Sequence, residues 1–276
     1  MAISKWTGEL DLSIFNNGRK SVSRDVYFQG ALKVIRPIYL NYSDIPTYYL
    51  VNVGGGYLDG DRYRLNVEVQ KDATVTLTSQ GATKIYKTLE DRVEQYQTFT
   101  IEDDAHMEYV GDPVIAYKYA KFYQKNVFNI SKTGSMYYTD IITPGWSEDD
   151  KHFTYEYMHM KNEIYVDNEL VVYDNLRLEP NKNRVDSLGY MEGFTHYGSC
   201  FFIHREVEES LVLELREIIE PFKDECRLGI SMLPTHGISI RILANMTEHI
   251  EEVFWEIQSH VTEKYFNRQI DFLRKY

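Results

Sequence analysis

The sequence predicts a mainly β protein with two amphipathic helices in its C-terminal third. The 276 residues include 23 tyrosines and 13 phenylalanines, and aromatic side chains favour the half-buried surface of a pleated sheet. Short runs of alternating apolar and polar residues recur along the chain between turn residues, which is typical of strands. Helical periodicity appears only late, at residues 208–220 and from Asn245 onward.

The clearest strand spans residues 63–70. Its odd-numbered side chains are apolar and its even-numbered side chains are polar, so one face is expected to be buried. A polar turn at Lys71-Asp72 follows, and residues 73–80 alternate again. We therefore expect these two strands to form a hairpin or adjacent rungs of one sheet.

Further strands are predicted along the middle of the chain by the same alternation and by the turn residues between the runs. They span residues 93–101, 107–110, 121–130, 135–142, 153–160, 163–166 and 169–178. Many short strands with almost no intervening helix indicate an all-β architecture rather than a parallel α/β sheet. No internal repeat of fixed period is present.

The two helices lie among strands in the C-terminal part. The first is predicted at residues 208–220, where Pro221 supplies a stop. The second begins after Asn245, which forms a capping-box pattern with Glu248. Strands are expected at residues 227–233 and 237–243. We predict one domain over residues 1–276, with a β body to about residue 205 and an α+β part over about 206–276.

Composition and charge restrict the class of protein. The formal net charge of −12 repels phosphate backbones, so we expect no nucleic-acid partner. The two cysteines, Cys200 and Cys226, cannot form a disulfide framework, which favours a reducing compartment. The N-terminal residues lack a signal-peptide pattern, and no apolar run is long enough to cross a bilayer. A cytoplasmic protein without a membrane partner is expected.

The motifs that could carry chemistry are weak. The run Gly54 to Asp61 is glycine-rich, but it lacks the Lys and Ser/Thr of a phosphate-binding loop. His196, Cys200 and His204 share one strand face, yet residues four apart on a straight strand lie roughly 13 Å apart, too far for one ion. No nucleophile motif is present. A carboxylate pair for glycoside hydrolysis remains open, because its separation is not visible in sequence.

The chain resembles the UreD family of urease accessory proteins, called UreH in some systems. The most specific stretch, from Val53 to Lys87, reads VGGGYLDGDRYRLNVEVQKDATVTLTSQGATKIYK. It is similar to the family's double glycine, Gly-Asp-Arg turn, alternating strand and Thr-x-Gln-x-Ala-Thr-Lys-x-Tyr segment. Further matches in family order are HMEYVGDPVIAYKYAKFYQ, the Pro144-Gly145 turn, DNLRLEP, LGYMEGFTHYGS and LGISMLP. They cover nearly the whole chain.

The resemblance implies a β-helix-like stack of short, mostly antiparallel strands with two helices. It also implies a scaffold rather than an enzyme. Such a scaffold binds urease apoprotein and UreF, and UreF recruits the GTPase UreG. GTP hydrolysis then drives insertion of nickel delivered by UreE. No tightly bound cofactor is expected, because a passage for nickel needs weak, exchangeable ligands and nickel would be bound only transiently.

Four acidic residues are candidates for a nickel passage. The resemblance places an interior acidic route at Asp61, Asp140 and Glu179, with Asp174 as a further candidate. We expect them to line a water-filled passage. For Asp61 an equally good interpretation is that its carboxylate caps the glycine-rich turn.

A second group of residues is expected to form an interior polar row. Its members are Arg62, Thr78, Gln80, Lys84 and Tyr86. The threonine is better explained by hydrogen bonds between strands than by a function. Lys84 is expected to form a buried ion pair with Asp61 that fixes the turn.

Two other classes of protein remain as alternatives. One is a stand-alone nickel-binding metallochaperone, which a cluster of cysteines and histidines would support. The other is a cytoplasmic β-helical hydrolase that acts on a polysaccharide with paired carboxylates. The scaffold is favoured over both, and it is expected to expose apolar or aromatic patches.

Overall fold

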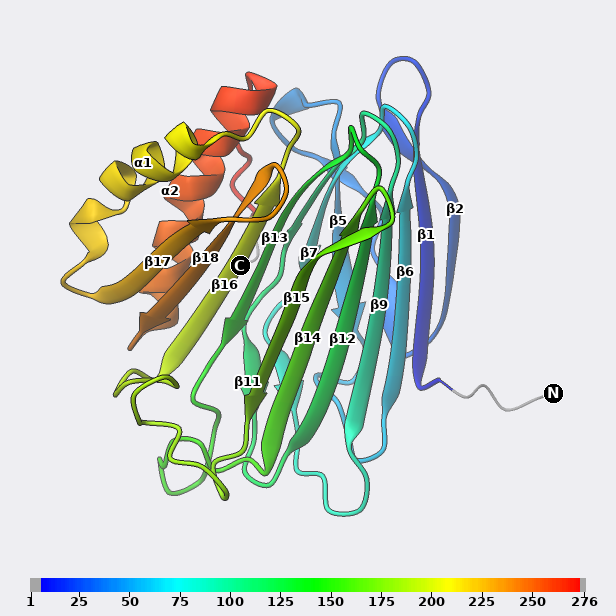
Figure 1. The fold of residues 1–276 in the computed structure, drawn as a ribbon. Helices are drawn as coiled ribbons and strands as arrows, with labels where there is room; N and C mark the ends of the chain where they lie inside the picture. The colour runs from blue at the N-terminus through cyan, green and yellow to red at the C-terminus, as the bar shows by residue number, and fades with distance from the viewer. Residues whose placement is uncertain (1–5, 274–276) are drawn as a thin grey trace.

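The computed structural model describes residues 6–273, and the side chain of Tyr42 lies outside this description. Two β-sheets face each other, and two helices cover the outer face of the second sheet (Figure 1). The first sheet has the order β15 (Glu169–Leu178), β14 (Tyr157–Val166), β12 (Lys121–Ile130), β9 (Val93–Ile101), β6 (Arg62–Val69), β1 (Gly8–Asn16) and β2 (Ser21–Gly30).

The second sheet is wider, and its eight main strands run in a single order. This order is β17 (Cys226–Met232), β18 (Gly237–Ala244), β16 (His196–Ile203), β13 (Ser135–Ile142), β10 (His106–Val110), β7 (Thr74–Ser79), β5 (Pro46–Asn52) and β3 (Leu32–Val34). Three short strands are added to it, namely β4 (Ile38–Tyr39), β8 (Thr83–Ile85) and β11 (Val114–Ala116). The predictions of a mainly β fold and of a β-helix-like stack are confirmed.

The direction of the strands differs from the prediction. The chain alternates between the sheets, so each coil returns to the same sheet in the same direction. In the body of the solenoid the neighbouring strands β6, β9, β12 and β14 are therefore parallel, as are β7, β10 and β13. Antiparallel pairs lie toward the sheet ends, for example β1 with β2 and β14 with β15.

The predicted hairpin at residues 63–80 is wrong for the same reason. β6 and β7 lie in opposite sheets, joined by an arch through Lys71-Asp72. The apolar faces of the two strands are both buried in the core between the sheets. A flat hairpin would place both strands in one sheet, whereas the arch lets the two faces pack across the core.

Most predicted strand bounds agree with the structure. Residues 93–101, 121–130, 135–142 and 169–178 are strands over those ranges. The predicted strands at 153–160 and 163–166 are instead the single strand β14, which begins at Tyr157 and pairs with all ten residues of β12. This continuous pairing holds residues 161 and 162 in the sheet, so residue 162 has a fixed place in the register of β12 and β14.

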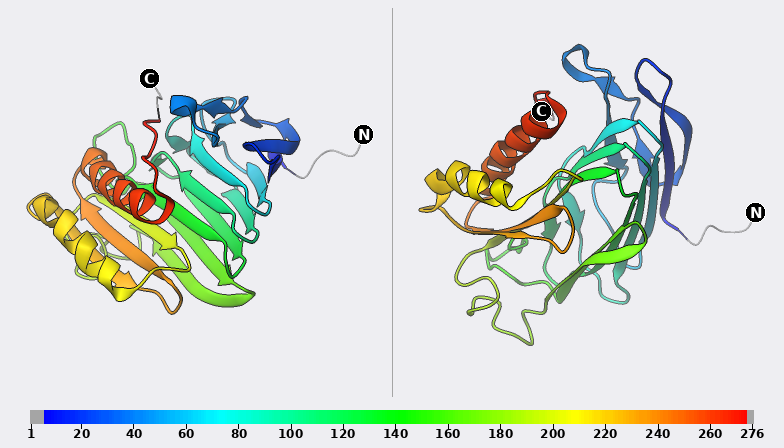
Figure 2. Two further views of the ribbon diagram at one scale, coloured as in Figure 1. Left: turned by 90° about the horizontal axis from the view of Figure 1, so that it is seen from above. Right: turned by 45° about the horizontal axis from the view of Figure 1, so that its top comes forward.

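Two hydrophobic clusters lie on the two sides of the second sheet. One fills the space between the sheets, and the other lies between the second sheet and the helices. Figure 2 shows both helices on this outer side, away from β1 and β2. β17 and β18 extend the same sheet as the body strands, so the C-terminal part shares a sheet with the body.

The helices agree with the prediction except at their ends. α1 spans Glu209–Ile218, and Pro221 lies in the short 3-10 helix Glu220–Phe222 that follows. α2 spans Thr247–Phe266, and Met246 is its N-cap without a side-chain capping bond. The capping box from Asn245 to Glu248 is therefore wrong, because the helix begins too late for Asn245 to cap it. Neither helix is both long and apolar enough to span a membrane within residues 6–273.

A buried carboxylate anchors α2 to the second sheet. Glu108 on β10 forms an ion pair with Arg268 and accepts a hydrogen bond from Gln258 of α2, at 2.9 Å. His106 Nε2 lies 3.3 Å from the same carboxylate. Burial by itself would raise the pKa of Glu108, but the hydrogen bond with His106 and the charge of Arg268 outweigh it and lower the pKa to about 2.

We predict that Glu108→Ala lowers the free energy of unfolding by about 3 kcal/mol, because it leaves the guanidinium of Arg268 without its buried partner. Urea titration at pH 7 measures this loss. The contribution of Glu108 is present above its unfolded pKa and is lost as the pH falls toward 2. Glu214→Ala is the control, since Glu214 pairs with Lys264 at the surface and should cost less than about 1 kcal/mol. Equal losses would contradict the anchoring role.

Candidate functional site

A row of polar side chains crosses the interior face of the first sheet. Gln97, Asn126, Asn162 and Asp174 occupy one register row on the neighbouring strands β9, β12, β14 and β15. The three amides are almost fully buried, with exposed fractions of 3%, 0% and 2%. We call these four residues the polar ladder. Because β9, β12 and β14 are parallel and in register, they stack equivalent positions, and the antiparallel strand β15 adds Asp174 opposite Asn162.

Hydrogen bonds connect three of the four rungs of the polar ladder. The Asn126 Nδ2 donates to Asn162 Oδ1 at 2.8 Å, and the Asn162 Nδ2 donates to Asp174 Oδ2 at 3.2 Å. The Asn126 Nδ2 also donates to the hydroxyl of Tyr138, at 2.6 Å, on the opposite sheet. The amides are thus oriented toward a carboxylate at the edge strand β15.

A second polar row faces the ladder from the other sheet. Asp140, Ser199 and Arg241 are register partners on β13, β16 and β18. The Asn162 Nδ2 lies 3.4 Å from Asp140 Oδ2, and an Arg241 nitrogen lies 3.0 Å from Asp174 Oδ1. Asp140 and Asp174 therefore share the amide of Asn162. With one guanidinium beside two carboxylates, this end of the interior attracts cations when both are ionised.

Asp140 titrates close to neutral pH. Burial raises its pKa to about 6, and the nearby charge of Asp174 acts in the same direction. Hydrogen bonds with Tyr138 and Asn162 oppose this rise. The carboxylate of Asp140 is thus mostly ionised at pH 7 and becomes neutral in mild acid.

Two buried amide oxygens of the polar ladder have no partner in the described part of the chain. The Gln97 Oε1 and Asn126 Oδ1 atoms accept no hydrogen bond from any described residue. Buried polar atoms in native proteins are normally satisfied by protein, water or an ion. These oxygens are therefore suited to a hydrated cation or to water, and oxygen atoms are hard ligands that bind divalent ions in an exchangeable way.

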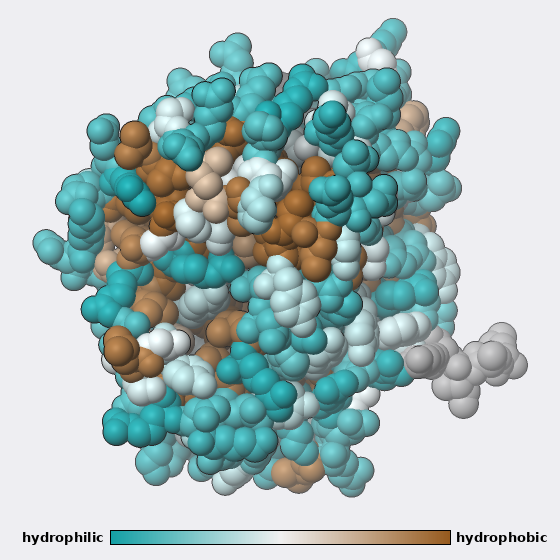
Figure 3. All heavy atoms as spheres, in the orientation of Figure 1, coloured by the Kyte–Doolittle hydropathy of each residue, from teal (hydrophilic) through white to brown (hydrophobic). Residues whose placement is uncertain are grey.

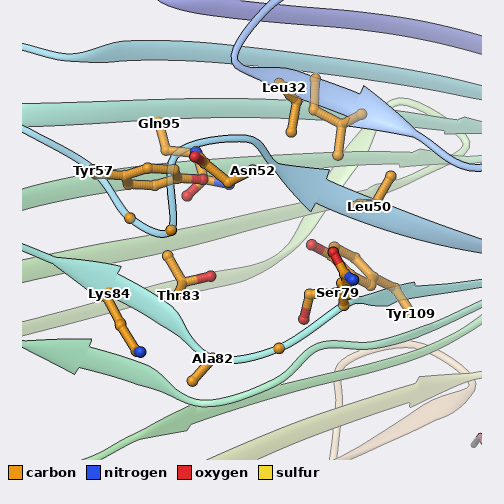
Figure 4. A pocket seen from close by; sticks show the side chains of 15 residues that line it. Leu32, Leu50, Asn52, Tyr57, Ser79, Ala82, Thr83, Lys84, Gln95 and Tyr109 are labelled. Carbon is orange, nitrogen blue, oxygen red and sulfur yellow. The ribbon is translucent and has the colours of Figure 1, made fainter. Parts of the chain in front are cut away.

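A cavity of about 390 Å³ lies beside the first rung of the ladder. Figure 4 shows Asn52, Tyr57 and Gln95 close together on one side of it and Tyr109 on the other. Gln95 precedes Gln97 by two residues, so both amides lie on the same face of β9. The described residues that line the cavity include one cation, Lys84, and no carboxylate.

Of the four predicted passage residues, the structure brings together Asp140 and Asp174. Asp61 lies at the start of β6 and accepts hydrogen bonds from the Leu58 N–H at 2.7 Å, from Thr7 Oγ1 at 3.0 Å and from the Tyr63 hydroxyl at 3.0 Å. This geometry supports turn capping for Asp61.

Glu179 lies beyond the end of β15, outside the polar ladder. Its carboxylate pairs with Arg177 at 2.9 Å and with Lys182 at 2.8 Å. The hydrogen bonds with Lys182 and Arg177 lower the pKa of Glu179. A carboxylate neutralised by two cations is a poor ligand for a metal ion, so Glu179 is better explained as a structural anchor for the loop that follows β15.

The predicted interior polar row does not form one row. Thr78 is buried and donates to the Val110 carbonyl at 2.7 Å, which confirms the expected bond between strands. β7 ends at Ser79, and Gln80 is exposed. Because the next strand, β8, starts only at Thr83, the alternation is interrupted and the later residues do not continue the face of Thr78.

The charged and aromatic members of that row have separate partners. Arg62 pairs with Glu94 at 2.8 Å, and the Tyr86 ring packs edge-on against a neighbouring tyrosine. Lys84 lines the cavity, and the ion pair expected between Lys84 and Asp61 is absent from the described residues. The reason is that local donors already occupy the carboxylate of Asp61.

Sequence reasoning missed most of the polar ladder. The signal for it was a polar residue on an apolar strand face, as with Asn162 between Met160 and Ile164. The predicted break at residues 161 and 162 hid this pattern. Arg241 on β18 had no such signal, because it pairs with a carboxylate of the other sheet.

The histidine and cysteine candidates lie outside this site. Cys200 is buried in the cluster beneath the helices, and burial raises its pKa to about 12. Across residues 6–273, no group of three or more His, Cys, Asp or Glu side chains has the geometry to hold a metal ion.

The fold and this interior define a β-solenoid protein with a buried polar ladder between its sheets. The chain belongs to the UreD family, because the family model described as UreD urease accessory protein matches residues 7–275. It is 61% identical over 273 residues to the urease accessory protein UreD of Staphylococcus saprophyticus, with 98% of each chain covered. It is also 55% identical over 278 residues to the protein of that name from Staphylococcus epidermidis, with both chains fully covered.

We predict that Asp140→Asn changes the pH dependence of stability. The raised pKa of Asp140 means that its contribution is present at low pH and is lost as the pH rises through about 6. Relative to the variant, the wild type should lose on the order of 2 kcal/mol of unfolding free energy between pH 4 and pH 7.5. Urea titrations at both values measure this, with Asp25→Asn on the exposed strand β2 as the control. A parallel trend in wild type and variant would show that Asp140 does not titrate as described.

Proposed function

We propose that this protein is a cytoplasmic urease maturation factor that acts as a scaffold rather than as an enzyme. It binds urease apoprotein and UreF, and through UreF it engages the GTPase UreG. Nickel delivered by UreE then passes through its interior to the urease active site in a GTP-dependent step. The observation that carries this proposal is the polar ladder, together with membership of the UreD family.

The ladder has the chemistry that transient nickel binding requires. It offers amide and carboxylate oxygens, which bind divalent cations weakly and exchange them readily. Thiolates would hold nickel too tightly for a passage. The cavity beside Gln95 and the ladder that starts at Gln97 lie along one face of β9, which supports a route along the interior from the cavity toward Asp174.

The alternatives fit the structure less well. A stand-alone nickel metallochaperone would need a tight site, whereas the ligands gathered here are oxygen atoms. A polysaccharide hydrolase needs two carboxylates in an open cleft. Asp140 and Asp174 instead share one buried amide, and Asp174 is paired with Arg241.

The surface supports a role in complexes. Large apolar side chains such as Leu188, Phe272 and Leu89 are exposed by 86%, 68% and 64%. On the face drawn in Figure 3, apolar side chains gather in the upper left half, whereas much of the remaining surface is polar. Gathered apolar surface of this kind is typical of protein contact sites.

We predict that the double variant Asp140→Asn/Asp174→Asn activates urease at least about tenfold less than wild type in cells that express the urease operon, because the interior loses the carboxylate of the polar ladder and the carboxylate that faces it. Nickel content of the purified urease measures the effect. The control is Asp11→Asn/Asp25→Asn, two carboxylates of β1 and β2, which should activate urease normally.

Co-purification separates loss of transport from loss of binding. Tagged wild type and the interior double variant should recover urease apoprotein equally, and each should recover UreG only when UreF is present. Normal urease activation by the interior variant would end the passage hypothesis. Failure of the folded wild type to recover urease apoprotein would end the scaffold hypothesis.

A further inference from the structure

We infer that Arg241 is the gate of the interior passage: its guanidinium takes the position of a cation at Asp174, and a divalent ion binds there only after Arg241 moves out. This inference rests on the passage proposed above and adds a residue that regulates it. The ligand is a divalent cation with oxygen ligands, and Ni²⁺ is the probe.

The position of Arg241 fits a gate. Its ion pair with Asp174 crosses from β18 of the second sheet to β15, which is the last strand of the first sheet. In the second sheet, β18 lies next to the edge strand β17. The ion pair therefore joins the two sheets where the first one ends, beside the last rung of the polar ladder.

Few interactions hold the guanidinium in place. Besides Asp174, an Arg241 nitrogen donates to the Ile240 carbonyl at 3.1 Å, and the guanidinium lies 4.7 Å from the centre of the Phe201 ring. The side chain is 33% exposed, whereas that of Asp174 is 17% exposed. A long side chain with access to solvent can leave its partner without unfolding its strand.

The surroundings of Asp174 would suit a divalent ion once Arg241 has moved. Asp140 lies within reach of the same Asn162 amide, which places two carboxylates on one site. Further along the ladder, the buried oxygens of Asn126 and Gln97 have no partner among residues 6–273 and can accept hydrogen bonds from the water shell of an ion. The Arg241 guanidinium contacts Asp174 and the Ile240 carbonyl, and neither amide oxygen accepts a bond from it or from any other described residue.

The test is the affinity of the purified full-length protein for Ni²⁺, measured by equilibrium dialysis. Arg241→Gln should bind Ni²⁺ at least about tenfold more tightly than wild type, because a competing positive charge has been removed from the site. Arg241→Gln combined with Asp140→Asn and Asp174→Asn should lose this gain. The matched control is Arg64→Gln, since Arg64 is 34% exposed and pairs with Asp11 at 3.1 Å between β6 and β1.

An unchanged or weaker affinity in folded Arg241→Gln would overturn the gate, and so would an equal gain in Arg64→Gln. Circular dichroism establishes whether a variant is folded. If Arg241→Gln does not fold, Arg241→Met is measured in its place. If neither variant folds, the test is made on the wild type with isotopically labelled arginine. The side-chain NMR signal of Arg241 is identified as the one that Arg241→Lys lacks, and saturating Ni²⁺ must alter this signal. The absence of any such change would overturn the gate. The failure of the passage and the failure of the gate are distinguishable. Normal urease activation by Asp140→Asn/Asp174→Asn would end the passage hypothesis, but it would not change the result that Arg241→Gln binds Ni²⁺ more tightly.

Discussion

Each coil of this solenoid places one strand in each of two facing sheets, and the coils stack in register. Residues at equivalent points of successive coils therefore form rows that cross the interior. An apolar row builds the core, and a single polar substitution per coil converts the row into a line of hydrogen-bonding groups. The polar ladder from Gln97 to Asp174 is such a line, and the site depends on this stacking.

A line of buried amides and carboxylates carries an energetic cost, because each polar group loses its water. Hydrogen bonds between rungs offset part of this cost, as in the bond from Asn126 to Asn162. The ion pair with Arg241 neutralises the charge of Asp174. The pKa of Asp140 is raised, so the cost of burying its charge is not fully offset. An interior held in this balance is suited to binding a cation transiently.

The sequence predicted the strands better than their arrangement. Alternation of apolar and polar side chains identifies a strand such as residues 121–130, since it depends only on which side chains are buried. It does not say which sheet receives the strand, so residues 63–80 were assigned to one sheet although β6 and β7 face each other. Strand direction follows from the order of coils, which local patterns do not record.

The site was predictable only in part for the same reason. Asp140 and Asp174 were found through family resemblance, but their shared partner Asn162 and the gate Arg241 come from other strands. Asp61 and Glu179 belong to the same family pattern, but their carboxylates already have local partners. The carboxylate of Asp61 accepts hydrogen bonds from local donors, and that of Glu179 pairs with cations. Sequence reveals which residues are acidic, whereas the tertiary structure decides which carboxylates remain available.

The most direct test of the passage is X-ray diffraction at the nickel absorption edge from crystals of the protein soaked in Ni²⁺. The account predicts an anomalous difference peak between the two sheets, within ligand distance of Asp140 or Asp174 and stronger in crystals of Arg241→Gln. Peaks confined to the outer surface, with none along the polar ladder in either protein, would contradict it.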